Sequence, residues 1–149
     1  MVMVLGWLAI YDGMWGELPS VGLWLAGGMA VAVVAVRWIS DGAVTWESVA
    51  SLLGAVAILG GTYLILYLVS RGKWVGNGDY ILGTIIALVL GEAWLALVTL
   101  FIANALGCIV MWPTVKKRKS KKIYFGPFMV IAFVVVMIFS NYLMLMVKW

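Results

Sequence analysis

Long apolar runs, separated by short polar segments, are the feature that most limits what this chain can fold into. Of its 149 residues, 66% are hydrophobic, and the mean hydropathy is +1.14. A soluble domain of this length has too little interior to bury so much apolar surface, so a lipid bilayer must take the place of water around it. The sequence therefore predicts an all-α fold, a polytopic membrane helical bundle, with residues 1–149 forming one domain.

Six apolar segments are expected to be helices. Four are long enough to cross a bilayer, namely residues 20–38, 49–69, 93–112 and 125–147. Two are shorter, residues 1–10 and 80–90, which would measure about 15 and 16 Å as helices. Pro19 suits the start of the first full span, because its missing N–H would be unpaired there in any case. The segment 1–10 lacks a basic start and a small-residue cleavage site, so we expect no cleavable signal peptide.

The charged residues orient these segments. Most of the excess positive charge lies in residues 116–122, and the positive-inside rule assigns such a run to the cytoplasm. We interpret this run as a topology signal and a contact for anionic lipid. Counting spans from it places Asp12 and Asp79 together on the cytoplasmic face of the inner (cytoplasmic) membrane. Three other acidic residues fall on the opposite face: Asp41, Glu47 and Glu92.

Few side chains remain that could perform chemistry. Histidine is absent, which excludes Ser-His-Asp and Cys-His catalysis, HExxH zinc proteases and most histidine-built metal sites. The single cysteine, Cys108, lies in an apolar run and is expected to be packing; it offers neither an internal disulfide nor a cysteine zinc cluster. Composition also excludes a soluble enzyme and a nucleic-acid binder. We expect no cofactor and no metal, and the carboxylates dominate what is left.

Two of the six acidic residues, Asp12 and Asp79, lie where polar and apolar segments meet. Ionisable groups at the edge of a hydrocarbon span indicate a functional site, because they are difficult to hydrate there. Asp79 ends the sequence Gly76-Asn77-Gly78-Asp79, in which Gly76 and Gly78 would allow unusual backbone angles, close approach of a substrate strand and movement of the loop. Each aspartate also has a plainer interpretation: Asp79 as a helix N-cap and Asp12 as part of an Asp-Gly turn.

The surroundings of these aspartates resemble type IV prepilin peptidases, a family of GxGD-type aspartyl membrane proteases. The segment from Tyr11-Asp12 to Leu18-Pro19, with proline seven residues after the aspartate, is similar to the family's first motif. Residues 76–79, followed by an apolar helix, are similar to its second, GxGD motif. Phe125-Gly126-Pro127, at the start of the last span, resembles its Phe-Gly-Pro segment. The three motifs occur in the family's order and cover nearly the whole chain.

The resemblance implies an aspartic endopeptidase that removes the short cationic leader of type IV prepilins or pilin-like precursors. The cut would follow a glycine, at the cytoplasmic boundary of the membrane. Asp12 and Asp79 would be the catalytic residues. Supporting motif residues would be Gly76, Gly78, Pro19, Gly126 and Pro127.

Two carboxylates close together in a poorly hydrated place cannot easily both ionise, so the pair is expected to hold one proton between them. The ionised member would activate a water, and the protonated member would donate to the developing oxyanion and later assist the leaving amine. Either aspartate can take either role.

The chain departs from the family pattern in three places. Gly13, Met14, Trp15 and Gly16 replace the polar residues common between the first aspartate and the proline, where only Glu17 remains. Ser20 stands where Asp or Asn usually follows Leu-Pro, and Ile81 where a lysine is frequent. The paired cysteines of larger bacterial members, which are linked to methylation of the new pilin N-terminus, are absent. The chain therefore resembles the short, peptidase-only members or the catalytic part of a longer enzyme, and we expect no methyltransferase activity.

Two other functions stay open. A non-enzymatic membrane transporter or assembly subunit would use the same aspartates to bind a proton or cation. A presenilin-like intramembrane protease would share the Tyr11-Asp12 motif, although no Pro-Ala-Leu motif follows toward the C-terminus. Association into a homo-oligomer is left open by every one of these functions.

Overall fold

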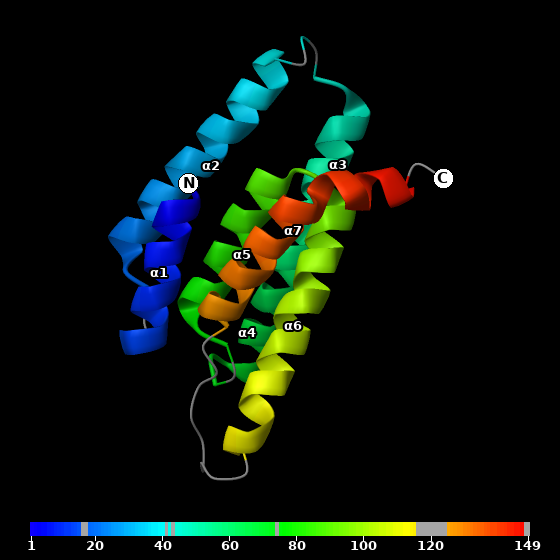
Figure 1. Ribbon diagram of the computed structural model, residues 1–149. Helices are drawn as coiled ribbons and strands as arrows, with labels where there is room; N and C mark the ends of the chain where they lie inside the picture. The colour runs from blue at the N-terminus through cyan, green and yellow to red at the C-terminus, as the bar shows by residue number, and fades with distance from the viewer. Residues whose placement is uncertain (16–17, 41, 43, 74, 116–124, 148–149) are drawn as a thin grey trace.

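The computed structural model describes residues 1–15, 18–40, 42, 44–73, 75–115 and 125–147, and in this part of the chain all regular structure is helical (Figure 1). The predicted all-α membrane bundle is thus confirmed. The helices are α1 (Val2–Trp15), α2 (Ser20–Ser40), α3 (Trp46–Val56), η1 (Ala57–Gly61), α4 (Thr62–Ser70), α5 (Asn77–Leu90), α6 (Ala93–Val115) and α7 (Gly126–Val147). The lysine-rich run that oriented the predicted spans, residues 116–122, lies outside the described residues.

Three helical stretches within the described residues are long and apolar enough to cross a membrane: Ser20–Ser40, Trp46–Ser70 and Ala93–Val110. They match three of the four predicted spans. Trp46–Ser70 is continuous and consists of α3, a π-helical turn (η1) and α4. The fourth predicted span, 125–147, forms α7. The continuous part of α7 with described side chains, Gly126–Ser140, is one of the shorter apolar helices.

Helix α5 lies at the centre of the bundle. It packs against α2, α3, η1, α4, α6 and α7, and Figure 1 shows it enclosed by these helices. Eight of its fourteen residues are buried, including Leu82, Ile86 and Leu90. Because protein rather than lipid surrounds α5, this helix does not need the length of a full span. Its polar N-terminal turn can therefore lie inside the bundle.

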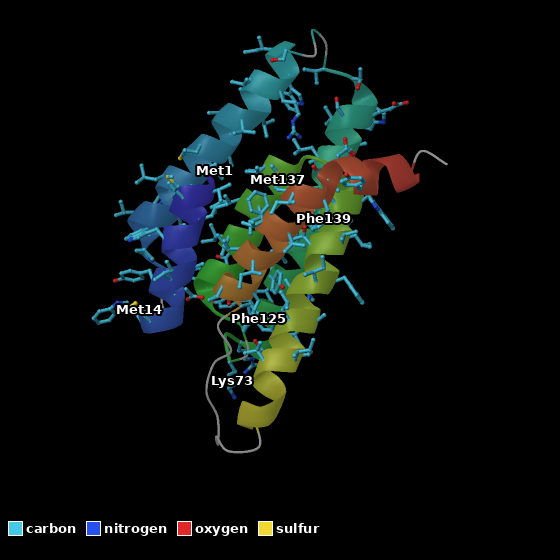
Figure 2. All side chains as sticks on the ribbon, viewed as in Figure 1. Met1, Met14, Lys73, Phe125, Met137 and Phe139 are labelled. Carbon is cyan, nitrogen blue, oxygen red and sulfur yellow. The ribbon has the colours of Figure 1, made fainter. Side chains whose placement is uncertain are left out.

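The helix ends next to the predicted motifs lie together at one end of the bundle. The C-terminal end of α1, the N-terminal ends of α5 and α7, and the C-terminal end of α6 all lie at the lower end in Figure 1. Met14, Lys73 and Phe125 are labelled there in Figure 2. The C-terminal ends of α2 and α5 and the N-terminal ends of α3 and α6 lie at the opposite end. This arrangement places Asp12 and Asp79 at the same end, as the counting of spans predicts.

Two helices extend further than the sequence predicts. Helix α1 continues past residue 10 through Asp12 and Gly13 to Trp15, so the interpretation of Asp12-Gly13 as a turn is wrong. Helix α5 begins at Asn77 rather than at residue 80, which puts Asp79 inside its first turn. In both cases the polar residue is tolerated in the helix because other helices cover it.

The far end of α5 is held by an arginine. Arg37 of α2 donates hydrogen bonds to the carbonyl oxygens of Val89 and Leu90, at 2.9 and 3.2 Å. The last carbonyls of a helix have no partner within the helix, and a cation there also interacts favourably with the helix dipole. Gly91 then ends α5 in a left-handed conformation, at φ 71°. A small pocket of about 80 Å³ opens beside Arg37, far from the two aspartates, and Glu92 also lines it.

Candidate active site

Asp79 is held by the first turn of α5. Its side chain is 2% exposed, and Oδ2 accepts a hydrogen bond from the backbone N–H of Gly76 at 2.9 Å. Asp79 thus caps the start of the helix from its third position, so the capping interpretation holds, in a modified form. The same carboxylate also lies near the backbone of Phe125 and Gly126 and near Asp12. Asp79 therefore caps α5 and still lies beside the other two motif segments.

Asp12 projects from α1 into the bundle. It is 3% exposed, and its interaction with the backbone amide of Gly126 ties it to the start of α7. Among the described residues, no donor reaches Asp12 Oδ2 in hydrogen-bonding geometry, although this oxygen is buried. A buried carboxylate oxygen without a donor is costly, and sites that tolerate it are commonly functional.

Gly126 is the point at which the two aspartates come together. Within the described chain, the backbone of α1 comes close to those of α2 and α7 but not to that of α5, so the helices carrying Asp12 and Asp79 are linked mainly through α7. The start of α7 contacts both instead, through the backbone amide of Gly126. A Cβ atom on Gly126 would collide with Asp12 Oδ2 and lie 3.1 Å from Asp12 Cγ, so only glycine lets the backbone come this near.

Two helix N-termini face the paired carboxylates. Asp79 lies in the first turn of α5, and both carboxylates lie against the first residues of α7. The unpaired N–H groups at a helix N-terminus carry partial positive charge, which favours a negative group beside them. Pro127 fits this place, since proline is tolerated in the first turn of a helix. Its ring also faces α1, where a Cβ atom on Gly13 would lie 3.7 Å from Pro127 Cγ.

Gly78 allows the first two motifs to pack against each other. A Cβ atom at Gly78 would lie 2.5 Å from Leu18 Cδ1 and 2.7 Å from Leu18 Cβ. Leu18 is followed by Pro19, whose carbonyl accepts a hydrogen bond from Leu23 N–H in the first turn of α2 at 3.1 Å. Leu18, just before α2, is thereby seated on the first turn of α5.

The glycines of the GxGD motif do not have the unusual backbone angles expected of them. Gly76 has φ −73° and ψ 158°, an extended conformation open to any residue, and Gly78 lies within α5. Neither is among the described glycines with positive φ. Gly78 is required for the approach of Leu18, whereas an added Cβ at Gly76 would be crowded by Asp79 Oδ2 at 3.3 Å without colliding with it. The close approach that the sequence analysis expected of a substrate strand is made here by Leu18 of the same chain.

Tyr63 and Asn104 are polar residues of this site that the sequence analysis missed. Tyr63 follows the π-helical turn and is fully buried; its hydroxyl has no hydrogen-bond partner among the described residues, but it lies within electrostatic reach of Asp79 and near the Asn104 side chain. A tyrosine within an apolar span gives no sign in the sequence of which way it points. The glycine pair Gly60-Gly61 was the available signal, because small residues mark places where membrane helices approach closely.

The described residues contain no group of three or more His, Cys, Asp or Glu side chains that could hold a metal ion. Comparison of the chain with models of protein families, with curated proteins and with solved structures finds no match. The geometry of the three motif segments is therefore the basis for assigning a function.

Proposed function

We propose that this protein is a membrane aspartyl endopeptidase, with Asp12 and Asp79 as its catalytic pair. Its substrates would be type IV prepilins or pilin-like precursors, whose cationic leader it would remove at the cytoplasmic boundary of the membrane. The observation that carries the proposal is that Gly126 lies directly against the Asp12 side chain and also beside Asp79, so that both buried carboxylates lie near the start of α7. Three sequence segments, chosen for their resemblance to one family, are neighbours at one end of the bundle.

The burial of both aspartates supports a shared proton. With 3% and 2% exposure, Asp12 and Asp79 have little water to stabilise two negative charges. Like charges in such a place favour a state with one proton between the two groups. The ionised aspartate takes a proton from a water as it attacks the peptide carbonyl. The protonated aspartate donates to the oxyanion and then assists the departing amine.

A substrate needs a conformational step before it reaches the pair. The start of α7 occupies the position between Asp12 and Asp79, and among the described residues no hydrogen bond joins the two carboxylates directly. A peptide can lie between them when Phe125 and Gly126 withdraw from α1 and α5. Such opening steps commonly gate enzymes that must exclude water until the substrate is bound.

Cleavage of a model prepilin in membranes tests this function. Asp12→Asn and Asp79→Asn are each expected to abolish the shorter product, because an amide can neither take up a proton from water nor donate an acidic one. Glu47→Gln is the matched control, since this exposed carboxylate lies in the first turn of α3 at the opposite end of the bundle. Equal membrane insertion of all four proteins must be shown. Wild-type cleavage by either aspartate variant would contradict the proposal.

A proton- or cation-binding membrane subunit is the second candidate function. The closed position of Gly126 favours it, because a proton reaches buried carboxylates more easily than a peptide does. In that case no shorter product forms from any prepilin, and Asp79→Glu keeps function. A peptidase would lose activity with Asp79→Glu, because the longer side chain displaces the carboxylate from Gly126.

A further inference from the structure

A small polar pocket lies at the end of the bundle away from the aspartates. It has a volume of about 80 Å³, and two side chains of opposite charge, Arg37 and Glu92, line it. The other lining residues are Val34, Trp38, Ser48, Leu52 and Gly91. Since one water molecule takes up about 30 Å³ in the liquid, the pocket has room for about two or three waters, or for one small polar group of a ligand.

Arg37 is held at this pocket by only part of its hydrogen-bonding capacity. Its two Nη atoms donate to the carbonyl oxygens of Leu90 and Val89, at 3.2 and 2.9 Å. An added Cβ atom on Gly91 would collide with Arg37 Nη1, so glycine leaves room for this approach. A guanidinium group has five N–H donors in a rigid plane. Two of them are used here, and within the described chain the other three have no protein partner.

Glu92 is anchored at the same pocket and also keeps a free atom. Its Oε2 accepts a hydrogen bond from the Ser51 hydroxyl at 2.8 Å, and Ser51 Oγ accepts from the backbone N–H of Ala93 at 3.2 Å. Among the described residues, Glu92 Oε1 has no protein donor, and no ion pair joins Glu92 to Arg37. A cation and an anion that line one pocket, each anchored elsewhere, suit a ligand that carries both charges.

The pocket lies at the boundary of the membrane-spanning helices. Arg37 and Trp38 are in the last turn of Ser20–Ser40, which is long and apolar enough to cross a membrane. Glu92 directly precedes Ala93–Val110, which is another such stretch. Lipid headgroups occupy this depth, and tryptophan is enriched there. Charged pockets between membrane helices are known to bind headgroups. A phospholipid is therefore the ligand with the most direct access to the pocket.

We propose that this pocket binds the headgroup of phosphatidylethanolamine, a zwitterionic phospholipid. The phosphate accepts hydrogen bonds from the free N–H groups of Arg37, whose planar geometry matches phosphate oxygens. The primary ammonium group enters the pocket and donates to Glu92 Oε1. The chemistry recognised is a phosphate joined by a short chain to an ammonium group, and the acyl chains hold it at the membrane boundary. The site is independent of the proposed peptidase, because it lies at the other end of the bundle.

Other common phospholipids satisfy only one half of this site. Phosphatidylglycerol has the phosphate but no cation, so Glu92 would face a second negative charge. Phosphatidylcholine has a cation, but its methylated nitrogen has no N–H to donate to Glu92. Water molecules alone could bridge the two side chains, and they would give no preference among lipids. A preference for phosphatidylethanolamine is therefore the property that distinguishes the proposed site.

Native mass spectrometry of the full chain tests this preference, because it detects lipids bound to the folded protein. Dissociation constants would be measured for the three phospholipids with matched acyl chains. A hydrogen bond to a charged group corresponds to about 10- to 100-fold in affinity, so phosphatidylethanolamine is expected to bind at least about tenfold more tightly than the other two. Equal binding of the three lipids, or tighter binding of either of the others, would overturn the proposal.

Glu92→Gln tests the half of the site that binds the ammonium group. The variant keeps an oxygen for the Ser51 hydroxyl and removes the charge, so it is expected to abolish the preference for phosphatidylethanolamine over phosphatidylglycerol. Glu47→Gln is the matched control, because this exposed carboxylate lies in the first turn of α3 at the same end of the bundle and does not line the pocket. A wild-type preference in Glu92→Gln, or an equal loss in Glu47→Gln, would overturn the proposal.

Leu52→Phe provides a second variant if Glu92→Gln does not insert into membranes. It keeps both charges, and its larger ring takes up part of the pocket, so the affinity for phosphatidylethanolamine is expected to fall. An unchanged affinity would overturn the proposal. Soluble phosphoethanolamine, added to the protein in nanodiscs of phosphatidylglycerol, separates the lipid from a free ligand. It is expected to bind far more weakly than the lipid, because no acyl chains hold it at this depth. Binding as tight as that of the lipid would overturn the assignment to a lipid.

Discussion

Gly126 lies so close to Asp12 that an added Cβ atom would collide with Asp12 Oδ2. The same glycine also lies beside Asp79, on a helix whose backbone does not come close to that of α1 in the described chain. The three short motifs that carry the family resemblance thus lie in segments that are neighbours in the structure. The contact also explains why the third motif needs glycine, since any side chain there would push the aspartates apart.

Gly126→Ala is expected to displace Asp12 and to reduce cleavage by at least about tenfold, because a small misplacement of a catalytic group is costly. Crowding of this kind typically also destabilises the fold, by about 1–3 kcal/mol. Gly28→Ala is the control, since an added Cβ there would meet nothing within 4 Å. The two effects can be measured as cleavage rates and thermal unfolding in detergent. Full activity of Gly126→Ala would show that Gly126 and Asp12 do not touch in the working enzyme.

Gly78→Ala is expected to destabilise the protein by about 1–3 kcal/mol, because the new methyl group would overlap Leu18. If packing is the reason, Leu18→Ala should relieve the crowding, and the double variant should be more stable than the sum of the two single effects predicts. A double-mutant cycle of unfolding measurements gives this coupling. If glycine instead served as a hinge, Leu18→Ala would bring no relief and cleavage would fall without a loss of stability.

Gly60 and Gly61 form an internally controlled pair in the π-helical turn. A Cβ atom on Gly60 would collide with Thr84 Oγ1 and lie 3.4 Å from Thr84 Cα, whereas one on Gly61 would meet nothing within 4 Å. Thr84 cannot easily turn away, since its hydroxyl donates to the carbonyl of Tyr80 at 2.9 Å. Gly60→Ala is therefore expected to cost about 1–3 kcal/mol of stability, and Gly61→Ala little. Equal losses in unfolding experiments would mean that η1 does not pack on α5 in this register.

Arg37→Met is expected to lower stability by about 1–3 kcal/mol, because it leaves the carbonyls of Val89 and Leu90 without their donors. Cleavage by the folded variant should continue, since Arg37 lies at the end of the bundle away from the aspartates. Lys73→Gln removes an equal charge from an exposed side chain and serves as the control. A variant that unfolds like wild type would show that Arg37 does not hold α5.

The bundle could largely be predicted from the sequence because hydropathy alone decides which segments enter a bilayer. The positions of the helix ends could not be predicted in this way. Asp12 looks like part of a turn from its neighbour Gly13, yet it lies within α1, because α7 covers it. The start of α5 was placed at residue 80 rather than Asn77 for the same reason, since burial by other helices outweighs the local signals of a polar, glycine-rich segment.

Some residues of the candidate site could likewise be predicted from the sequence, and others could not. Asp12 and Asp79 could be found because acidic residues are rare in this chain. Gly126 could be found because it lies in the Phe-Gly-Pro segment that resembles a family motif. Tyr63 could not, because its position beside the site depends on a π-helical turn, which sequence patterns do not reveal, and on the approach of α5 that Gly83 permits.

Non-additivity of the two aspartate substitutions is the most direct test of the central claim, that Asp12 and Asp79 act as one catalytic pair. Cleavage of a model prepilin would be measured for Asp12→Asn, Asp79→Asn and the double variant, with membrane insertion matched to wild type. When two catalytic residues work as a unit, an enzyme loses nearly all its activity when either residue is removed. The account predicts that each single variant is as inactive as the double variant. A single variant that still cleaves at an appreciable rate, with the double variant lower by the product of two independent losses, would contradict it.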